Sequence, residues 1–248
     1  MLKPILNIIT AVSRENNLYF IQEELNKINS LEIRWHLIFD GTSMTSLKIP
    51  QDINFYHAEI SNNDRKDYSG AVQKNIALSR VKEGWVYALD DDNIVHPNFP
   101  KTFIKAINNH PNKKAFVFSQ TNFKNQVIIP SFLAKRTIEG IPFQNWAIDT
   151  AGYVVHYDLI KKTNARYLEF VHESDRHFWR HIVENCKDEI EFIDEIAAYH
   201  NALRYSRHPD DNLCHRPYNQ YEKMMLLHNH NVKRPNPQFA NAYKNTKL

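Results

Sequence analysis

Apolar runs alternate with segments of helical spacing along the first half of the chain. Residues 5–12, 33–39 and 85–89 are short, mostly apolar segments of the kind that form buried strands. In residues 17–28 and 69–81, apolar side chains recur every three to four positions, which is the period of one helix face. This alternation predicts an α/β fold with a mostly parallel central sheet covered by helices on both faces.

The pattern becomes less regular after residue 120. We expect one domain over residues 1–203, in which residues 1–120 alternate strand and helix and residues 121–203 add further strands. Residues 204–248 are mostly polar and are predicted to form an appended segment. The other predicted elements are strands at residues 53–56, 115–119, 127–129, 151–155, 190–193 and 196–199, and helices at residues 97–107 and 173–183.

Three consecutive aspartates, Asp90, Asp91 and Asp92, followed by Asn93, come directly after the apolar run at residues 85–89. We call Asp90–Asp92 the aspartate triplet. Like charges at a strand end repel, and a partly buried carboxylate needs a partner. Carboxylate oxygens suit Mg²⁺ or Mn²⁺, and open α/β sheets bind ligands at the carboxyl ends of their strands. We therefore prefer a metal site to the alternative, a solvated turn.

Composition narrows the classes of function. The chain has only five glycines in 248 residues, and no two are spaced for a dinucleotide-binding or Walker phosphate loop. A bound phosphate would then need a metal to neutralise it, which makes the aspartate triplet more informative. A net charge of +3 gives no argument for nucleic acid, so no nucleic-acid partner is expected.

The chain also lacks signals for export. No apolar stretch approaches about 20 residues, so no membrane-spanning helix is expected, and the start leaves no room for a signal peptide. Cys186 and Cys214 lack metal-ligand spacing and are too few for a disulfide framework. We expect a cytoplasmic protein. The polar, basic tail leaves open a contact with the inner membrane surface, and oligomerisation is also left open.

Several further residues are candidates for a site, each with an ordinary alternative. Asp40 ends the second apolar run, where a plain turn residue is the favoured reading. Lys74 lies on a predicted helix and could face a nucleotide or simply be solvated. Glu173 opens a helix, either as a general base or as a complement to the helix dipole. His200 follows an apolar stretch and is either a single metal ligand or an ordinary histidine.

No zinc site is expected on the predicted helix at 173–183. His177 and His181 are four residues apart and share one helix face, but the intervening residues lack the glutamate of the zinc-protease motif.

Taken in order, these segments resemble the A-type (GT-A fold) nucleotide-sugar glycosyltransferases. Their pattern is most similar to that of the glucuronyltransferase family, which has a D-D-D-N metal motif. The resemblance covers about residues 5–202. The matching segments are Trp35-His36-Leu37-Ile38-Phe39-Asp40, Gly70-Ala71-Val72-Gln73-Lys74-Asn75-Ile76-Ala77-Leu78, Asp90-Asp91-Asp92-Asn93, Ile148-Asp149-Thr150-Ala151-Gly152-Tyr153, Glu173-Ser174 and His200.

The resemblance implies a nucleotide-binding half at 1–120, an acceptor-binding half at 121–203, and Mn²⁺ or Mg²⁺ as cofactor. It also implies a role for each matched residue: Asp40 would lie at the base of the nucleotide, Lys74 near the nucleotide in place of a family arginine, and Asp90 at the ribose. Asp92 would bind the metal, with Asp91 close by, and His200 would lie at the metal or the diphosphate. Asp149 would lie near the sugar and acceptor, and Glu173 would be the general base, with Asp175 and Asp149 as the other carboxylates for that role.

The expected function is an inverting, metal-dependent hexosyl- or glycuronosyltransferase. It would move a sugar from a nucleotide-diphosphate donor, in the first place a UDP-sugar, to a hydroxyl of a glycan or lipid-linked glycan. Two alternatives stay open. A nucleotidyltransferase would want a basic glycine-rich loop near the start, and residues 12–15 contain no glycine. An inactive sugar-binding module would have no need of the aspartate triplet together with Glu173.

Overall fold

The computed structural model describes the greater part of the domain predicted at residues 1–203. The predicted appended segment at 204–248 and Glu173 lie outside the described residues, as do the side chains of Asp40, 54–60 and 127–147. The described residues are 2–14, 17–40, 54–60, 70–121, 127–128, 131–138, 141–169, 174–200 and 202–203.

Four parallel strands form one half of the main sheet. β1 (Ile5–Val12) pairs with β2 (Glu32–Asp40) on one side and with β4 (Trp85–Ala88) on the other, and β3 (Asn54–Ile60) pairs with β2. The order is therefore β3-β2-β1-β4. Because all four strands run the same way, their carboxyl ends meet at one edge, where the predicted site residues follow.

The other half of the sheet is mixed in direction. β10 (Tyr153–His156) lies antiparallel between β4 and β6 (Ala115–Thr121), and β11 (Ile190–Tyr199) is parallel to β6. The short strands β5 (Ile94–Val95) and β7 (Val127–Ile128) add antiparallel pairs to β11 and β6. Inserting β10 between parallel neighbours brings the chain near residue 150 beside the end of β4.

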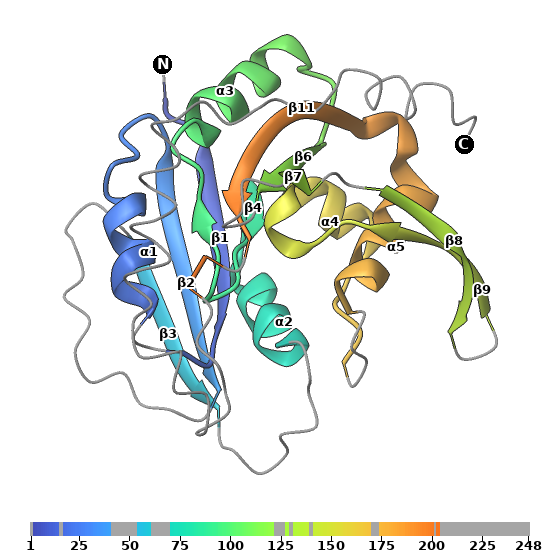
Figure 1. Cartoon of the computed structure of the whole chain (residues 1–248), viewed down its shortest axis with the longest axis horizontal. Helices are drawn as coiled ribbons and strands as arrows, with labels where there is room; N and C mark the ends of the chain where they lie inside the picture. The colour runs from blue at the N-terminus through green and yellow to red at the C-terminus, as the bar shows by residue number, and fades with distance from the viewer. Residues whose placement is uncertain are drawn as a thin grey trace.

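A separate hairpin stands away from the main sheet. β8 (Ser131–Ile138) and β9 (Ile141–Ala147) pair only with each other among the described strands, and Figure 1 shows the hairpin projecting beyond α5.

Helices cover both faces of the sheet. α1 (Leu18–Leu25) and α3 (Phe99–Asn109) pack in one hydrophobic cluster, and α2 (Ala71–Arg80), α4 (Tyr157–Thr163) and α5 (Ser174–Cys186) pack in another (Figure 1). Side chains alternate between the two faces of a strand, so neighbouring residues of β1 belong to different clusters. The predicted fold class is confirmed.

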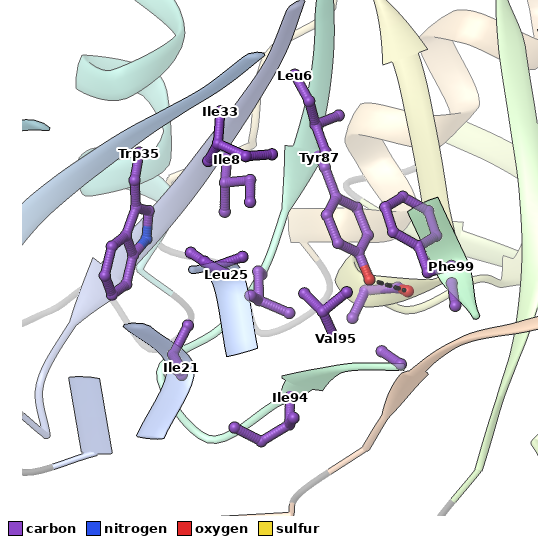
Figure 2. Packing of buried hydrophobic residues seen from close by; sticks show 14 of the residues in the cluster. Leu6, Ile8, Ile21, Leu25, Ile33, Trp35, Tyr87, Ile94, Val95 and Phe99 are labelled. Atoms are coloured by element: carbon purple, nitrogen blue, oxygen red, sulfur yellow. Dashed lines mark hydrogen bonds between the residues drawn. The ribbon is translucent and has the colours of Figure 1, made fainter. Parts of the chain in front are cut away.

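Aromatic packing fixes the position of β4. Tyr87 is fully buried, its ring stacks on Phe99 at a centroid distance of 4.9 Å, and its hydroxyl donates to Ala151 O at 3.2 Å (Figure 2). Because that carbonyl belongs to the turn before β10, the bond ties β4 to the 3₁₀ turn at Thr150–Gly152. The packing thus holds both segments that approach the aspartate triplet.

The structure differs from the sequence-based prediction in a few elements. The two strands predicted at 190–193 and 196–199 are one strand, β11, whose pairing with β6 shifts register at Ile193/Ile196 and Ile196/Ala198. Such irregularities bend a strand, and β11 forms a long arc in Figure 1. β5, the β8–β9 hairpin and α4 were not predicted, because they are short or carry no sustained apolar period.

Candidate active site at the strand ends

The aspartate triplet begins directly beyond the end of β4. Leu89 N donates to Ile9 O at 3.0 Å, which carries the parallel pairing with β1 one residue past the strand. The chain then turns, with Asn93 N donating to Asp90 O at 3.0 Å. In this turn the three carboxylates make different contacts, although Asp91 and Asp92 share Arg14.

Asp91 organises the loop that follows β1. Its Oδ2 accepts from Ser13 N and Arg14 N, both at 2.6 Å, and from Ser13 Oγ at 3.1 Å, while the Arg14 guanidinium pairs with Oδ1. The side chain of Asn17 donates to Asp91 O at 2.9 Å and to Leu203 O at 2.8 Å. Asp91 is therefore fixed to the loop after β1, and Asn17 links both to the chain at Leu203.

Asp92 is the least compensated member of the triplet. Its side chain is 12% exposed, and its Oδ2 lies 3.3 Å from Arg14 Nη1. Burial, and then the charge of Asp90, raises the pKa of Asp92 to about 6, although Arg14 and His200 act in the opposite direction. A carboxylate held in this way would be stabilised by a further cation.

Asp90 is held from two sides. Thr150 Oγ1 donates to Asp90 Oδ2 at 2.7 Å, and Lys74 Nζ lies 3.0 Å from Oδ1. Lys74 Nζ also donates to Asp175 Oδ1 at 3.3 Å, so one ammonium joins the end of β4 to the first turn of α5. Lys74 was predicted to face a nucleotide or solvent, but its side chain is only 2% exposed and is occupied by these two carboxylates.

The charges around Lys74 affect one another strongly. Burial would lower the pKa of Lys74, but Asp175 and then Asp90 outweigh it, and the pKa lies well above its usual value. Burial raises the pKa of Asp175, and the negative charges of Asp90 and Asp149 add to that effect against the opposing ammonium. Asp175 is therefore a carboxylate of raised basicity beside the aspartate triplet.

Asp149 and His200 form a second charged pair. Asp149 Oδ2 lies 2.8 Å from His200 Nδ1, and Asp149 Oδ1 accepts from Thr150 N at 2.9 Å. Burial favours the neutral form of each group, but their mutual attraction prevails: the pKa of Asp149 is lowered and the pKa of His200 is raised. His200 N donates to Thr121 O at 2.8 Å, which fixes the backbone beyond β11.

α2 is bound to the segment that contains Tyr167 and Glu169. Asn75 Nδ2 donates to Tyr167 O at 2.9 Å and to Glu169 Oε1 at 3.1 Å, and Tyr167 N donates back to Asn75 Oδ1 at 3.0 Å. The Tyr167 ring lies 5.4 Å from Lys74 Nζ, within range of a cation–π contact. α2 can approach β1 this closely because Gly70 precedes it at φ 67°, where a Cβ would lie 2.5 Å from Ala11 Cβ.

The carboxylates of the site suit a metal ion whose coordination shell is completed by a substrate. Among the described residues, no group of three or more His, Cys, Asp or Glu side chains could hold a metal ion by itself. Mg²⁺ and similar ions at phosphate sites commonly take one or two carboxylates and complete their coordination with phosphate oxygens and water. Asp92, buried among like charges, fits such a partial set.

The structure brings together most of the predicted site residues. Asp90, Asp91, Asp92, Asp149, Lys74 and His200 all lie in the described site, and Asp175 joins them. Asp40 ends β2 at the same edge of the sheet, and its side chain lies outside the described residues. His177 and His181 have ring centroids 4.9 Å apart on α5 and belong to no described metal-binding group.

Sequence reasoning missed Arg14. The sequence did offer a signal, because Arg14 is a basic residue just after a buried strand. It lies on the edge of the sheet where the aspartate triplet was expected. It was overlooked because residues 12–15 were considered only for a glycine-rich loop.

Comparisons with known proteins bear on the fold. No family model matches the sequence, and no curated protein matches it. Among solved structures, the 1–349 fragment of S. aureus TarS matches with a TM-score of 0.60 and 12% identity, over 80% of this chain and 60% of that chain. The fragment in complex with UDP-GlcNAc matches with a TM-score of 0.60 and 14% identity, over 91% of this chain and 65% of that chain.

TarS is a GT-A-like glycosyltransferase. This chain has the GT-A fold. It spans about 60% of the length of the TarS fragment, and at this identity the similarity concerns the fold alone. The resemblance to the glucuronyltransferase family stays a prediction. Within the described part of the chain, none of the helices has the length and apolar character needed to cross a bilayer.

Proposed function

We propose that this protein is an inverting, metal-dependent glycosyltransferase that takes a sugar from a nucleotide-diphosphate donor. The observation that carries the proposal is Asp92, a buried carboxylate with a raised pKa at the end of β4 in a GT-A fold. Solved TarS structures contain UDP and UDP-GlcNAc, which supports a UDP-sugar as the donor to test first.

The donor half of the proposed site is built from the strand ends. Asp92 would hold Mn²⁺ or Mg²⁺, with His200, positioned by Asp149, at the metal or the diphosphate. The bound metal would stabilise negative charge on the departing diphosphate. Asp90, anchored by Thr150 and Lys74, would meet the ribose, and Asp40 the nucleotide base.

The acceptor half requires a base that removes the proton of the attacking hydroxyl. We assign this role to Glu173, immediately before α5, and a positioned base of this kind contributes about 10²–10⁴-fold to the rate. Asp175 is the described carboxylate at the start of α5, and Asp149 is the third option. Direct attack by the hydroxyl on the anomeric carbon would invert its configuration. The acceptor we propose is a glycan or a lipid-linked glycan, at the cytoplasmic face of a membrane.

A donor-hydrolysis assay tests the proposal. UDP release from UDP-GlcNAc and a panel of other nucleotide sugars should require Mn²⁺ or Mg²⁺ and should be lost in Asp92→Asn. Asp188→Asn, which removes an exposed carboxylate from the turn before β11, is the matched control and should retain activity. Binding of UDP-sugars with no release of UDP would indicate a binding module. Release of pyrophosphate from a nucleoside triphosphate would indicate a nucleotidyltransferase.

A further inference from the structure

Arg14 shares the carboxylate that we assign to the metal. Its guanidinium pairs with Asp91, and the same nitrogen, Nη1, lies 3.3 Å from Asp92 Oδ2. A cation bound to Asp92 must therefore share this carboxylate with the guanidinium or displace it. We propose that Arg14 is a built-in counter-ion that competes with the divalent cation for Asp92 and so couples metal binding to diphosphate binding. The inference rests on the proposed function, because it takes Asp92 as the metal ligand.

The two contacts of Arg14 are unequal. Asp91 is only 3% exposed, and it also accepts the backbone N–H groups of Ser13 and Arg14 at 2.6 Å, so it anchors both the guanidinium and the backbone of the same residue. The contact with Asp92 is longer than the usual length of a charge-assisted hydrogen bond. Arg14 can consequently leave Asp92 and remain attached to Asp91.

The charge balance of the triplet makes the competition significant. The Arg14 guanidinium carries a full positive charge, as arginine does in proteins, and it lies within contact of both Asp91 and Asp92. This positive charge stabilises the crowded carboxylates, and it also repels a second cation that approaches Asp92. Metal ion alone should therefore bind weakly.

A bound diphosphate would favour the metal at Asp92 and would also give Arg14 a new partner. Its oxygens can complete the coordination of the metal, and a guanidinium pairs well with phosphate, so the group displaced from Asp92 gains a new partner. Metal and nucleotide should then strengthen each other's binding. Because such coupling is reciprocal, Mn²⁺ must tighten UDP binding by the same factor as UDP tightens Mn²⁺ binding.

The test is direct measurement of Mn²⁺ binding, by the electron paramagnetic resonance signal of free Mn²⁺, with and without UDP. Arg14→Gln should bind Mn²⁺ alone about tenfold more tightly than the wild type, because a nearby positive charge has been removed. The factor by which UDP tightens Mn²⁺ binding should fall correspondingly. Arg14→Lys, which keeps the charge, should resemble the wild type more than Arg14→Gln does.

Arg34→Gln is the matched control. It changes the net charge equally, but Arg34 pairs with Glu32 and Glu83 near the opposite end of β2, so Mn²⁺ binding should not change. A folded Arg14→Gln protein with unchanged or weaker affinity for Mn²⁺ alone would overturn the inference and leave the proposed function standing. Absence of Mn²⁺ binding by the wild type, with and without UDP, would overturn both.

The wild-type protein supplies a test that does not depend on the folding of a variant. Isothermal titration of UDP at zero and saturating Mn²⁺ should show tighter binding with the metal. If UDP and Mn²⁺ bind independently, Arg14 does not couple them and the inference is wrong.

Discussion

Lys74 and Asp175 form a largely buried ion pair between two helices that are about a hundred residues apart in the sequence. Lys74 Nζ lies 3.3 Å from Asp175 Oδ1, and the side-chain exposures are 2% and 19%. The same ammonium contacts Asp90 at 3.0 Å. One cation therefore joins the aspartate triplet, through Asp90, to the start of α5.

Replacing this lysine should damage both stability and activity. Lys74→Met leaves two partly buried carboxylates without their shared cation and should lower the free energy of unfolding by up to about 3–5 kcal/mol, the loss expected for a fully buried pair. Lys162→Met removes an exposed ion pair with Glu189 and should change stability far less, because solvent screens exposed pairs. Urea unfolding measures both values. If the buried pair is responsible, the second substitution in Lys74→Met/Asp175→Asn should restore part of the loss.

Glu173 and Asp175 are both candidate bases, and substitution should show which of them acts on the acceptor. Glu173→Gln should lower kcat by about 10²–10⁴-fold and leave UDP affinity nearly unchanged, because a base acts only on the acceptor proton. Asp175→Asn should also disturb Asp90 through Lys74, and should therefore weaken donor binding as well. Steady-state kinetics together with UDP titration distinguish these patterns. Full activity of Glu173→Gln would transfer the role of base to Asp175 or Asp149.

His36 should make stability depend on pH. Burial, with the nearby charges of Arg80 and Arg34, lowers its pKa from 6.5 to about 4. Between these values the unfolded chain binds the proton and the folded protein does not. Stability should therefore be complete above pH 6.5 and fall by about 3 kcal/mol as the pH falls to 4.

Urea unfolding at pH 7.5 and pH 5 measures the effect of His36. His36→Gln should reduce the difference between the two pH values, while His110→Gln, which changes a more exposed histidine, should retain it. Equal pH dependence in the wild type and in His36→Gln would show that other groups are responsible.

Gly84 should resist substitution more than Gly152. Gly84 has φ 81°, and a Cβ there would lie 2.7 Å from Ile5 O, so Gly84→Ala combines backbone strain with a clash and should cost more than about 2 kcal/mol. At Gly152 the nearest atom would be 3.5 Å away, and Gly152→Ala should cost much less. Thermal or urea unfolding compares the two, and equal losses would contradict the steric explanation.

The sequence was sufficient to predict the parallel half of the sheet. Residues 5–12 and 85–89 are mostly apolar because these strands are buried on both faces, and such segments are visible without coordinates. The aspartate triplet was equally visible, since clustered like charge after a buried strand requires compensation. By contrast, the division of β11 into two predicted strands was wrong, because its irregular pairing with β6 interrupts the side-chain alternation.

What the sequence determined by itself was the layered α/β fold and the acidic strand end, because both follow from local patterns of burial and charge. What only the tertiary structure decided was the partner of each charged group. Asp91 binds the loop at Arg14, Asp90 shares Lys74 with Asp175, and Asp149 pairs with His200. These partners are far apart in the sequence, and their choice depends on how the strands and helices pack, which no local pattern records.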